Sequence, residues 1–288
     1  MSAEVELAAV LRPRDDAPAS AARTIAPLLA RMPWRRIGDS TLPWLLPIAL
    51  LALWFTGAEQ GWISPQVLPP PQFVWETLRD LAMSGDLWLH VSTSFTRVGV
   101  GFAVGTLLGL ALGSAMGLSR SFETYVLPSF NALVQIPVLA WLPFVLLIVG
   151  IGEPLKYILI AKAALVPVAL NTLQGFRQTP SALREVGQVY GYTRRQQVLE
   201  IVLPHAVPTL FTGVRLGFTK AWLSLVVVEL VASSEGLGYL IVYGRQLFQL
   251  DLVMAAVIVV GAIGYAIDRL LDRLETSMHR RQPGGAAP

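Results

Sequence analysis

Charged side chains stand within or beside strongly apolar stretches of this 288-residue sequence. An ionised group at membrane depth costs about 2.5 kcal/mol or more, so the charges that remain there usually serve a purpose. Basic groups exceed acidic ones, which favours an anion as ligand; the candidate contacts are Arg97, Gln135, Arg215 and Glu229. The alternative is structural, because the basic side chains could pair with Glu229 or extend to a membrane interface. The charged groups are Arg97, Lys156, Lys162, Arg215, Lys220, Glu229 and Asp268.

Residues for covalent or metal-assisted catalysis are absent or scattered. The sequence contains no cysteine, which excludes disulfides, thiolate metal sites and thiol nucleophiles. Its histidines, His90, His205 and His279, are far apart and form no H-E-x-x-H motif. No G-x-x-x-x-G-K-[ST] loop is present to hold ATP phosphates. We therefore expect no catalytic residue, no metal site and no cofactor bound by this chain.

The composition indicates what kind of element positions these charges. Hydrophobic residues make up 54% of the chain, charged residues 14%, and the mean hydropathy is +0.57. These values are too apolar for an ordinary soluble domain and predict a membrane protein. The net charge of +3 and the pI near 9.4 do not indicate a nucleic-acid partner, because the basic residues lie beside apolar segments rather than in one patch.

Apolar runs near bilayer-spanning length predict the fold class, an all-α polytopic membrane bundle of about six transmembrane helices. A helical loop, residues 179–204, joins the fourth span to the fifth. The expected spans are residues 42–57, 95–117, 126–150, 155–176, 205–232 and 252–271.

Arginine is distributed unevenly among the connections between these spans. Only Arg79 and Arg245 lie on one side, so by the positive-inside rule both termini and the 179–204 loop are cytoplasmic. We divide the chain into a flexible N-terminal tail (1–40), a transmembrane domain (41–274) and a C-terminal tail (275–288). The arginines of the cytoplasmic side are Arg12, Arg14, Arg23, Arg31, Arg35, Arg36, Arg120, Arg177, Arg184, Arg194, Arg195, Arg269, Arg273, Arg280 and Arg281.

Glycine recurs at every fourth position of the second span. Such a stripe drifts slowly around a helix and predicts a close crossing against another helix, because helices associate in lipid through van der Waals contact. The alternative is that the bare backbone lines a substrate path. The glycines are Gly101, Gly105, Gly109, Gly113 and Gly117.

Prolines punctuate the third, fourth and fifth spans. Each one inside a helix removes a hydrogen bond and kinks the rod, and such helices can bound a cavity. The kinks could equally serve only to shape the bundle. The prolines are Pro128, Pro137, Pro143, Pro167, Pro204 and Pro208.

The 179–204 loop reads as two short helices. Thr179 is the expected N-cap of the first, with Pro180 at its first position. Gly191 can end that helix in the left-handed conformation. Thr193 and Gln196 form a capping signal for the second helix, which should run to a turn at Pro204. These features predict a compact knob. The alternative is an ordinary amphipathic loop that lies on the membrane surface.

The spacing of Glu185, Gly191, Ile201, Leu203 and Pro204 resembles the cytoplasmic coupling loop of ATP-binding cassette importer permeases. The family's usual small pair after the glutamate is Val186-Gly187 here, so the small size is kept only at Gly187. The contact with the partner could therefore be packed differently.

Further stretches resemble the six-span permeases that import nitrate, taurine and alkanesulfonates, and the resemblance covers residues 68–274. A segment from Gln135 through Pro143 to Gly152 also resembles the corresponding importer stretch. The other stretches are Ser94–Val98, Pro204–Pro208, Gly213–Arg215, Ala221-Trp222, Glu229 and Gly236–Leu240.

This resemblance implies an assembly in the bacterial inner membrane. It contains a homodimer of this chain, two cytoplasmic ATPase subunits that carry ATP and Mg, and an external substrate-binding protein that is periplasmic or lipid-anchored. The chain would form the path for a small anion and move its Glu185 loop with the ATPases. Rival interpretations are an ion-gradient-driven secondary transporter, for which we see no inverted repeat, and the same importer architecture for a neutral or cationic nutrient.

Overall fold

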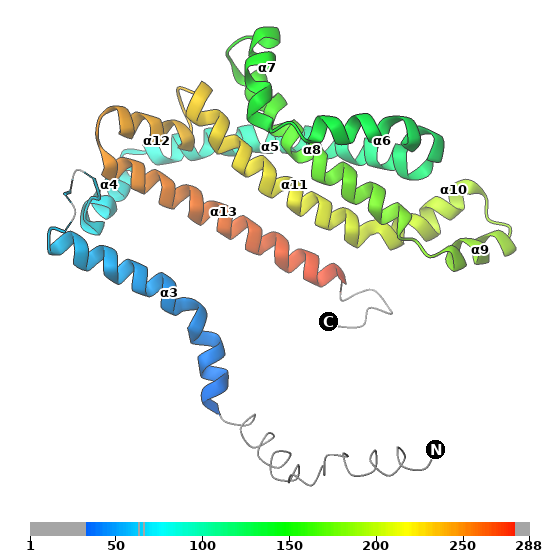
Figure 1. Ribbon diagram of the computed structural model, residues 1–288, viewed down its shortest axis with the longest axis horizontal. Helices are drawn as coiled ribbons and strands as arrows, with labels where there is room; N and C mark the ends of the chain where they lie inside the picture. The colour runs from blue at the N-terminus through cyan, green and yellow to red at the C-terminus, as the bar shows by residue number, and fades with distance from the viewer. Residues whose placement is uncertain (1–32, 63, 66, 280–288) are drawn as a thin grey trace, which may run out of the picture. The chain divides into compact units, whose positions relative to one another are not determined.

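The computed structural model describes residues 33–62, 64–65 and 67–279, and all regular structure within them is helical. This confirms the all-α class. Figure 1 labels the α-helices. Their bounds, with the 3-10 helix η1 and the π-helix η2, are α3 Pro33–Glu59, α4 Pro71–Ser84, α5 Asp86–Leu118, α6 Arg120–Val134, η1 Val138–Trp141, α7 Leu142–Val149, α8 Glu153–Arg177, α9 Ser181–Val189, α10 Arg194–Gln196, η2 Gln197–Val202, α11 Leu203–Ala232, α12 Leu237–Gln246 and α13 Leu250–His279.

Helix α3 belongs to a unit of its own that ends at Trp62. The helix begins at Pro33, where a proline is tolerated because the N–H groups of the first turn have no helical partner anyway. The predicted boundary at residue 40 therefore lies inside a helix, and the rest of the predicted tail, residues 1–32, lies outside the described residues. The apolar part of α3, Leu45–Glu59, overlaps most of the expected first span, residues 42–57.

Three long helices, α5, α8 and α11, form the centre of the second unit (Figure 1). Helix α8 contacts both of the others extensively. In its most apolar stretch 56% of the residues are buried, against 17% in α13. Helix α8 is therefore the central helix, and its fully buried residues include Leu155, Leu159, Ile160 and Ala164.

The glycine stripe of α5 lies along this central helix. A Cβ atom at Gly101 would stand 2.6 Å from Ile160 Cγ2, and one at Gly109 would stand 2.8 Å from Val168 Cβ. Gly105, Gly113 and Gly117 meet α8 in the same way. The packing interpretation of the stripe is therefore confirmed, because every one of these glycines is turned toward α8 rather than toward open space.

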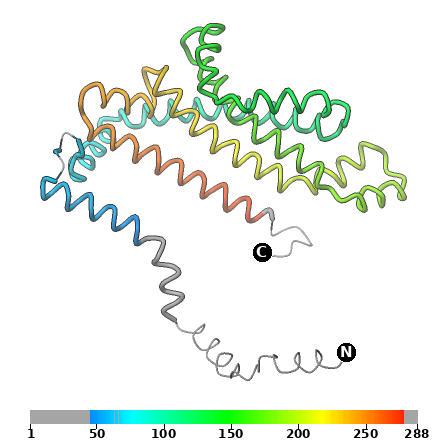
Figure 2. The backbone as a smooth tube through the Cα atoms, viewed as in Figure 1, coloured from blue at the N-terminus to red at the C-terminus, as the bar shows by residue number. Residues whose placement is uncertain are grey.

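The third expected span is not one rod. Helix α6 and the following η1–α7 segment are bent by 94° to each other. The tube in Figure 2 turns sharply between these two segments. Pro137 stands at the break, immediately before η1. A proline donates no N–H and disfavours α-helical backbone at the preceding residue, so the apolar run breaks there. The kink expected from the prolines of this span is thus present at Pro137, but as a break between two helices rather than a bend within one helix over 126–150.

The helix that contains the fifth span begins earlier than expected. The second loop helix continues through Pro204 into this span instead of ending there. Residues Arg194–Ala232 form one unbroken helical segment through α10, η2 and α11. The π-helical turns of η2 directly precede Pro204, and the axis changes direction near this junction in Figure 1. A π segment and a proline are both recognised causes of such bends. The predicted turn is therefore a bend within a helix.

The remaining spans agree with expectation. Helices α5 and α8 contain the second and fourth, and α13 contains the sixth and continues to His279, past the predicted start of the C-terminal tail. Residues 280–288 lie outside the described part. By length and composition the described residues hold three helices able to cross a membrane, or five if each bent pair counts as one, and the shorter apolar helix of α3 in addition.

Replacing Gly105 by leucine should lower the free energy of unfolding by about 3 kcal/mol or more, because the new side chain would overlap the backbone of Ala161 and the Cβ of Ala164. Thermal unfolding in detergent measures the effect. The control is Gly99→Leu on the same helix, where a Cβ has nothing within 4 Å. Equal melting temperatures of the two variants would contradict the packing role of the stripe.

Candidate functional site

The 179–204 segment folds as a knob in which a glycine faces an isoleucine. Gly187 is buried on α9, and a Cβ there would stand 2.6 Å from Ile201 Cδ1 on η2. Leu203 packs with Phe176, Val202 and Ala206 in a small apolar cluster at the end of α8. The small size of residue 187 therefore has a local reason, since α9 could not lie against η2 with a larger side chain there.

The turn between the two helices has the predicted chemistry. Gly191 has φ +70°, in the left-handed region that favours glycine, and Tyr192 N–H donates to Gly187 O at 2.9 Å. Thr193 and Gln196 form the reciprocal capping box, with Gln196 N–H donating to Thr193 Oγ1 at 3.3 Å and Thr193 N–H to Gln196 Oε1 at 3.0 Å. Both features confirm the sequence prediction.

The start of the knob differs from the prediction. Helix α9 begins at Ser181, so Pro180 rather than Thr179 occupies the N-cap position, and no side chain caps the helix. Thr179 is 5% exposed instead, with its hydroxyl turned inside. Helix α9 is anchored by an arginine instead: Arg184 Nη2 donates to Phe176 O, at the end of α8, at 2.6 Å. The knob is thereby tied to the central helix.

The outer face of the knob carries one carboxylate among exposed apolar side chains. Glu185 is exposed and has no ion-pair or hydrogen-bond partner in the described part of the chain. Val186, Val189 and Tyr190 are 52%, 87% and 78% exposed on the same short helix. Large apolar side chains clustered at a surface mark an interaction site. Pro204, also exposed, is the second residue of α11.

At the opposite end of the long helices, Arg97 lies in a buried ion network. It is 3% exposed and donates from Nη1 to Glu229 Oε1 at 2.9 Å, and from Nε and Nη2 to Glu153 at 2.9 and 2.7 Å. Nη1 also donates to Glu235 O at 2.6 Å. Four of the five guanidinium N–H groups are thus used by protein acceptors. Lys156 adds a second cation to Glu153 at 2.7 Å.

This network closes the turn between α11 and α12. Glu229, which is 1% exposed, accepts from Ser94 Oγ and from Gly238 N–H, each at 2.9 Å. Leu237 N–H donates to Ser94 Oγ at 2.9 Å. Gly236 has φ +111° and lies so close to the Glu229 carboxylate that no Cβ would fit. Three of the sequence stretches singled out above therefore meet at one point.

The other predicted pathway residues lie elsewhere. Arg215 on α11 pairs with three carboxylates of α13: Asp268 at 3.2 Å, Asp272 at 2.6 Å and Glu275 at 2.7 Å. Thr212 donates to Glu275 as well. Gln135 is exposed at the end of α6, at the break before η1. Of the four candidates the structure brings only Arg97 and Glu229 together, and it joins them to each other.

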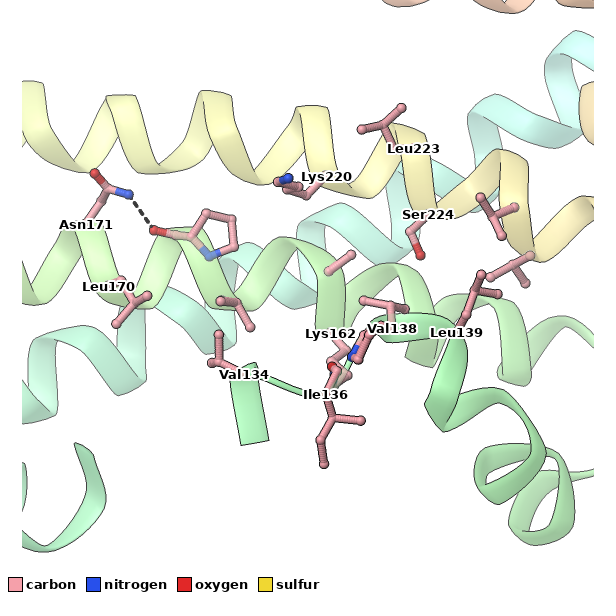
Figure 3. Close-up of a pocket in the computed structure, with 16 residues that line it drawn as sticks. Val134, Ile136, Val138, Leu139, Lys162, Leu170, Asn171, Lys220, Leu223 and Ser224 are labelled. Atoms are coloured by element: carbon pink, nitrogen blue, oxygen red, sulfur yellow. Dashed lines mark hydrogen bonds between the residues drawn. The ribbon is translucent and has the colours of Figure 1, made fainter. Parts of the chain in front are cut away.

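A cavity of about 570 Å³ lies between α6–η1, α8 and α11. Figure 3 shows Lys162 and Lys220 reaching it from two helices and the hydroxyl of Ser224 turned toward it. Pro137 and Pro167 line it, so for these two prolines the cavity interpretation is confirmed. The lining residues are Val134, Ile136, Pro137, Val138, Leu139, Lys162, Ala163, Val166, Pro167, Leu170, Asn171, Lys220, Leu223, Ser224, Val227 and Val228.

Sequence reasoning gave the two arginines priority over these lysines. Both lysines stood among the charges within the apolar spans, but nothing in the sequence separated charges that meet a carboxylate from charges that face a cavity. The sequence did hold one usable signal, because Pro167 and Lys162 belong to the same span, α8 in the structure. The structure adds a link to the second proline: Lys162 Nζ donates to Ile136 O at 3.1 Å, and Ile136 directly precedes Pro137. A kinked helix with a basic residue nearby would have pointed to the cavity.

Comparisons with known proteins find relatives of this chain. A family model described as "Binding-protein-dependent transport system inner membrane component" matches residues 105–280. The "Putative aliphatic sulfonates transport permease protein SsuC" of Bacillus subtilis (strain 168) is 37% identical over 261 residues, 90% of this chain and 95% of the relative. The "Taurine transport system permease protein TauC" of Escherichia coli (strain K12) is 34% identical over 238 residues, 80% of this chain and 86% of the relative. The "Nitrate import permease protein NrtB" of Synechocystis sp. is 34% identical over 190 residues, 66% of this chain and 69% of the relative.

A solved structure has the same fold. A chain of the MetNI methionine ABC transporter, in an inward-facing conformation, superposes with a TM-score of 0.59 and 21% sequence identity. The match covers 68% of this chain and 98% of that chain. At this identity the likeness concerns the fold alone.

Replacing Arg97 by methionine should lower the free energy of unfolding by about 3–5 kcal/mol, because Glu229 would stay buried without its cation. Denaturant titration in detergent, followed by tryptophan fluorescence, measures the loss. The double variant Arg97→Met, Glu229→Gln removes the unpaired charge and should recover part of it. An unchanged stability of the single variant would show that the network does not hold the α11–α12 turn.

Proposed function

Because the chain belongs to the family of binding-protein-dependent transport system inner membrane components, we propose that it forms the translocation path for a small anionic nutrient and couples its passage to ATP hydrolysis by a separate subunit. Within that family it is an ATP-binding cassette importer permease of the sulfonate, taurine and nitrate type. It is a multi-pass inner membrane protein.

The observation that carries the coupling proposal is the unbroken helical segment Arg194–Ala232. One end of this segment packs against α9, the helix that exposes Glu185 and its apolar neighbours. The other end lines the cavity with Lys220 and Ser224. A displacement of the knob by a soluble partner would therefore move the cavity wall without first unfolding or reordering a linker. Movement of a rigid helix between two packings is a recognised means of switching a protein between states.

The assembly that we propose has two copies of this chain, two cytoplasmic ATPase subunits and an external binding protein, periplasmic or lipid-anchored. ATP and Mg²⁺ would be held by the ATPase subunits. Both termini and the knob would face the cytoplasm, where arginine is concentrated. Of the coupling-loop residues, the exposed Glu185, Gly191 and Pro204 would lie at the contact, and Gly187, Ile201 and Leu203 would hold the shape of the knob.

The proposed substrate is a small oxyanion. The relatives are named for aliphatic sulfonates, taurine, nitrate and bicarbonate. Growth of a strain that lacks this chain, on alkanesulfonates or taurine as the sole sulfur source or nitrate as the sole nitrogen source, tests the proposal. We expect a defect on one class that the intact chain restores. Uptake that needs no ATP and follows an ion gradient would overturn the importer function.

Reversing the charge of Glu185 should abolish co-purification of the ATPase subunit while membrane insertion stays normal, because Glu185 is exposed and has no partner within the described residues. The control is Glu76→Arg, the same change at an exposed position of α4. Gly191→Leu should act like Glu185→Arg, since φ +70° is strained for any side chain. Normal recovery of the ATPase with both loop variants would refute this account of the knob.

A further inference from the structure

We propose that the cavity between α6–η1, α8 and α11 is an oxyanion subsite of the translocation path, in which Lys162, Lys220 and Ser224 hold the anionic head and the apolar wall takes an uncharged hydrocarbon body. This inference rests on the proposed function and adds the residues and the class of ligand. The class is an organic monoanion with a hydrocarbon chain, for which an alkanesulfonate is the probe.

The two ammonium groups at this cavity have no carboxylate beside them. The chain contains only three lysines, and two of them line the cavity; no acidic residue does. Lys220 is exposed and has no ion-pair or hydrogen-bond partner in the described part of the chain. The third lysine, Lys156, shows the contrast, since it pairs with Glu153 at 2.7 Å. Two ammonium groups without a carboxylate partner, in an otherwise apolar wall, create a positive potential that attracts an anion.

Lys162 is oriented by two contacts and still has hydrogen-bond donors free for a ligand. Its Nζ donates to Ile136 O at 3.1 Å and stands 4.9 Å from the centre of the Trp141 ring. An ammonium group has three N–H donors, so two are left for a ligand. The carbonyl and the ring orient the group at the break between α6 and η1, next to the cavity.

Ser224 supplies a neutral donor to the same site. Its side chain is 9% exposed, and its Oγ is buried with no hydrogen-bond partner among the described residues. It lies four positions after Lys220, so both residues are on one face of α11. A buried hydroxyl without a partner loses free energy unless a ligand or water satisfies it. An oxyanion bound by both lysines would accept this hydrogen bond.

The rest of the wall selects for the body of the ligand. Apart from Lys162, Lys220, Ser224 and Asn171, the lining side chains are apolar, and Asn171 Nδ2 is occupied by Pro167 O at 2.8 Å. A hydrocarbon chain would bury apolar surface there at about 25 cal/mol per Å². Nitrate has no such chain. Taurine carries an ammonium group, which would meet two lysines and no carboxylate, so both ions should bind more weakly than an alkanesulfonate.

The other basic residues within the spans do not offer this chemistry. Arg97 directs four N–H groups to protein acceptors, and Arg215 faces three carboxylates. An anion would have to displace these partners. Among the described basic residues within the spans, Lys162 and Lys220 are the ones that line a cavity without a carboxylate partner.

Calorimetric binding of hexanesulfonate, taurine and nitrate to the purified permease–ATPase complex, without the binding protein, tests the subsite. The wild type should bind hexanesulfonate at least tenfold more tightly than the other two. Lys220→Met should weaken that binding at least tenfold and Lys220→Arg should largely preserve it. Ser224→Ala should weaken it severalfold. Arg269→Met, which removes one positive charge from an exposed site on α13, should have no effect.

ATP-dependent uptake into proteoliposomes, with the binding protein present, separates this inference from the proposed function. Absence of ATP-dependent uptake of all three anions by the wild type would refute the function. Normal wild-type uptake together with unchanged hexanesulfonate affinity in Lys220→Met would refute the subsite alone. Wild-type preference for taurine or nitrate, or no measurable binding of hexanesulfonate, would do the same. Because Lys220 has no partner within the described residues, its substitution is not expected to disturb folding.

Discussion

Backbone contact between α5 and α8 is the constraint on which the other features depend. In lipid, helices gain little from burying apolar surface against one another, so association requires close van der Waals approach. Five glycines of α5 permit that approach along most of α8, and Gly213 and Gly217 of α11 do the same on another side of it, against Asn171 and Val168. Helix α8 is thus held between two small-residue surfaces. Its remaining side, with Lys162 and Pro167, is left to line the cavity.

Ion pairs then fix how α11 lies along this core. Near its C-terminal end, Glu229 meets Arg97 of α5, and closer to its start Arg215 meets the carboxylates of α13. The Arg97–Glu229 pair is buried; such a pair adds little net stability, because desolvation opposes the attraction, but a misplaced partner is heavily penalised. It therefore specifies position. The pairs of Arg215 are partly exposed to solvent and constrain the helix less strongly.

Local signals in the sequence predicted local structure well, whereas long-range partners were beyond them. The glycine spacing, the Thr193–Gln196 box and the left-handed Gly191 each depend on a few neighbouring residues, and each was confirmed. The proline at position 137 predicted a kink, but neither proline spacing nor hydropathy gives an angle, so the size of the break, 94°, could not be predicted. Arg97 and Glu229 are 132 positions apart, and the sequence left open whether Arg97 pairs with Glu229, extends to a membrane interface or contacts a ligand. Which basic residue faces a cavity depends on packing among three helices, which no single segment encodes.

The π-helical turns of η2 imply that the orientation of the knob depends on a count of residues. A π turn holds one residue more than an α turn between hydrogen-bonded groups, and each residue of an α-helix rotates the chain by about 100°. Removing one residue from Gln197–Val202 would restore the ordinary period and turn everything before it around the axis of α11. Glu185 would then point in another direction, and the contacts that tie the knob to α8, Arg184 with Phe176 O and Val202 with Phe176, would have to form anew.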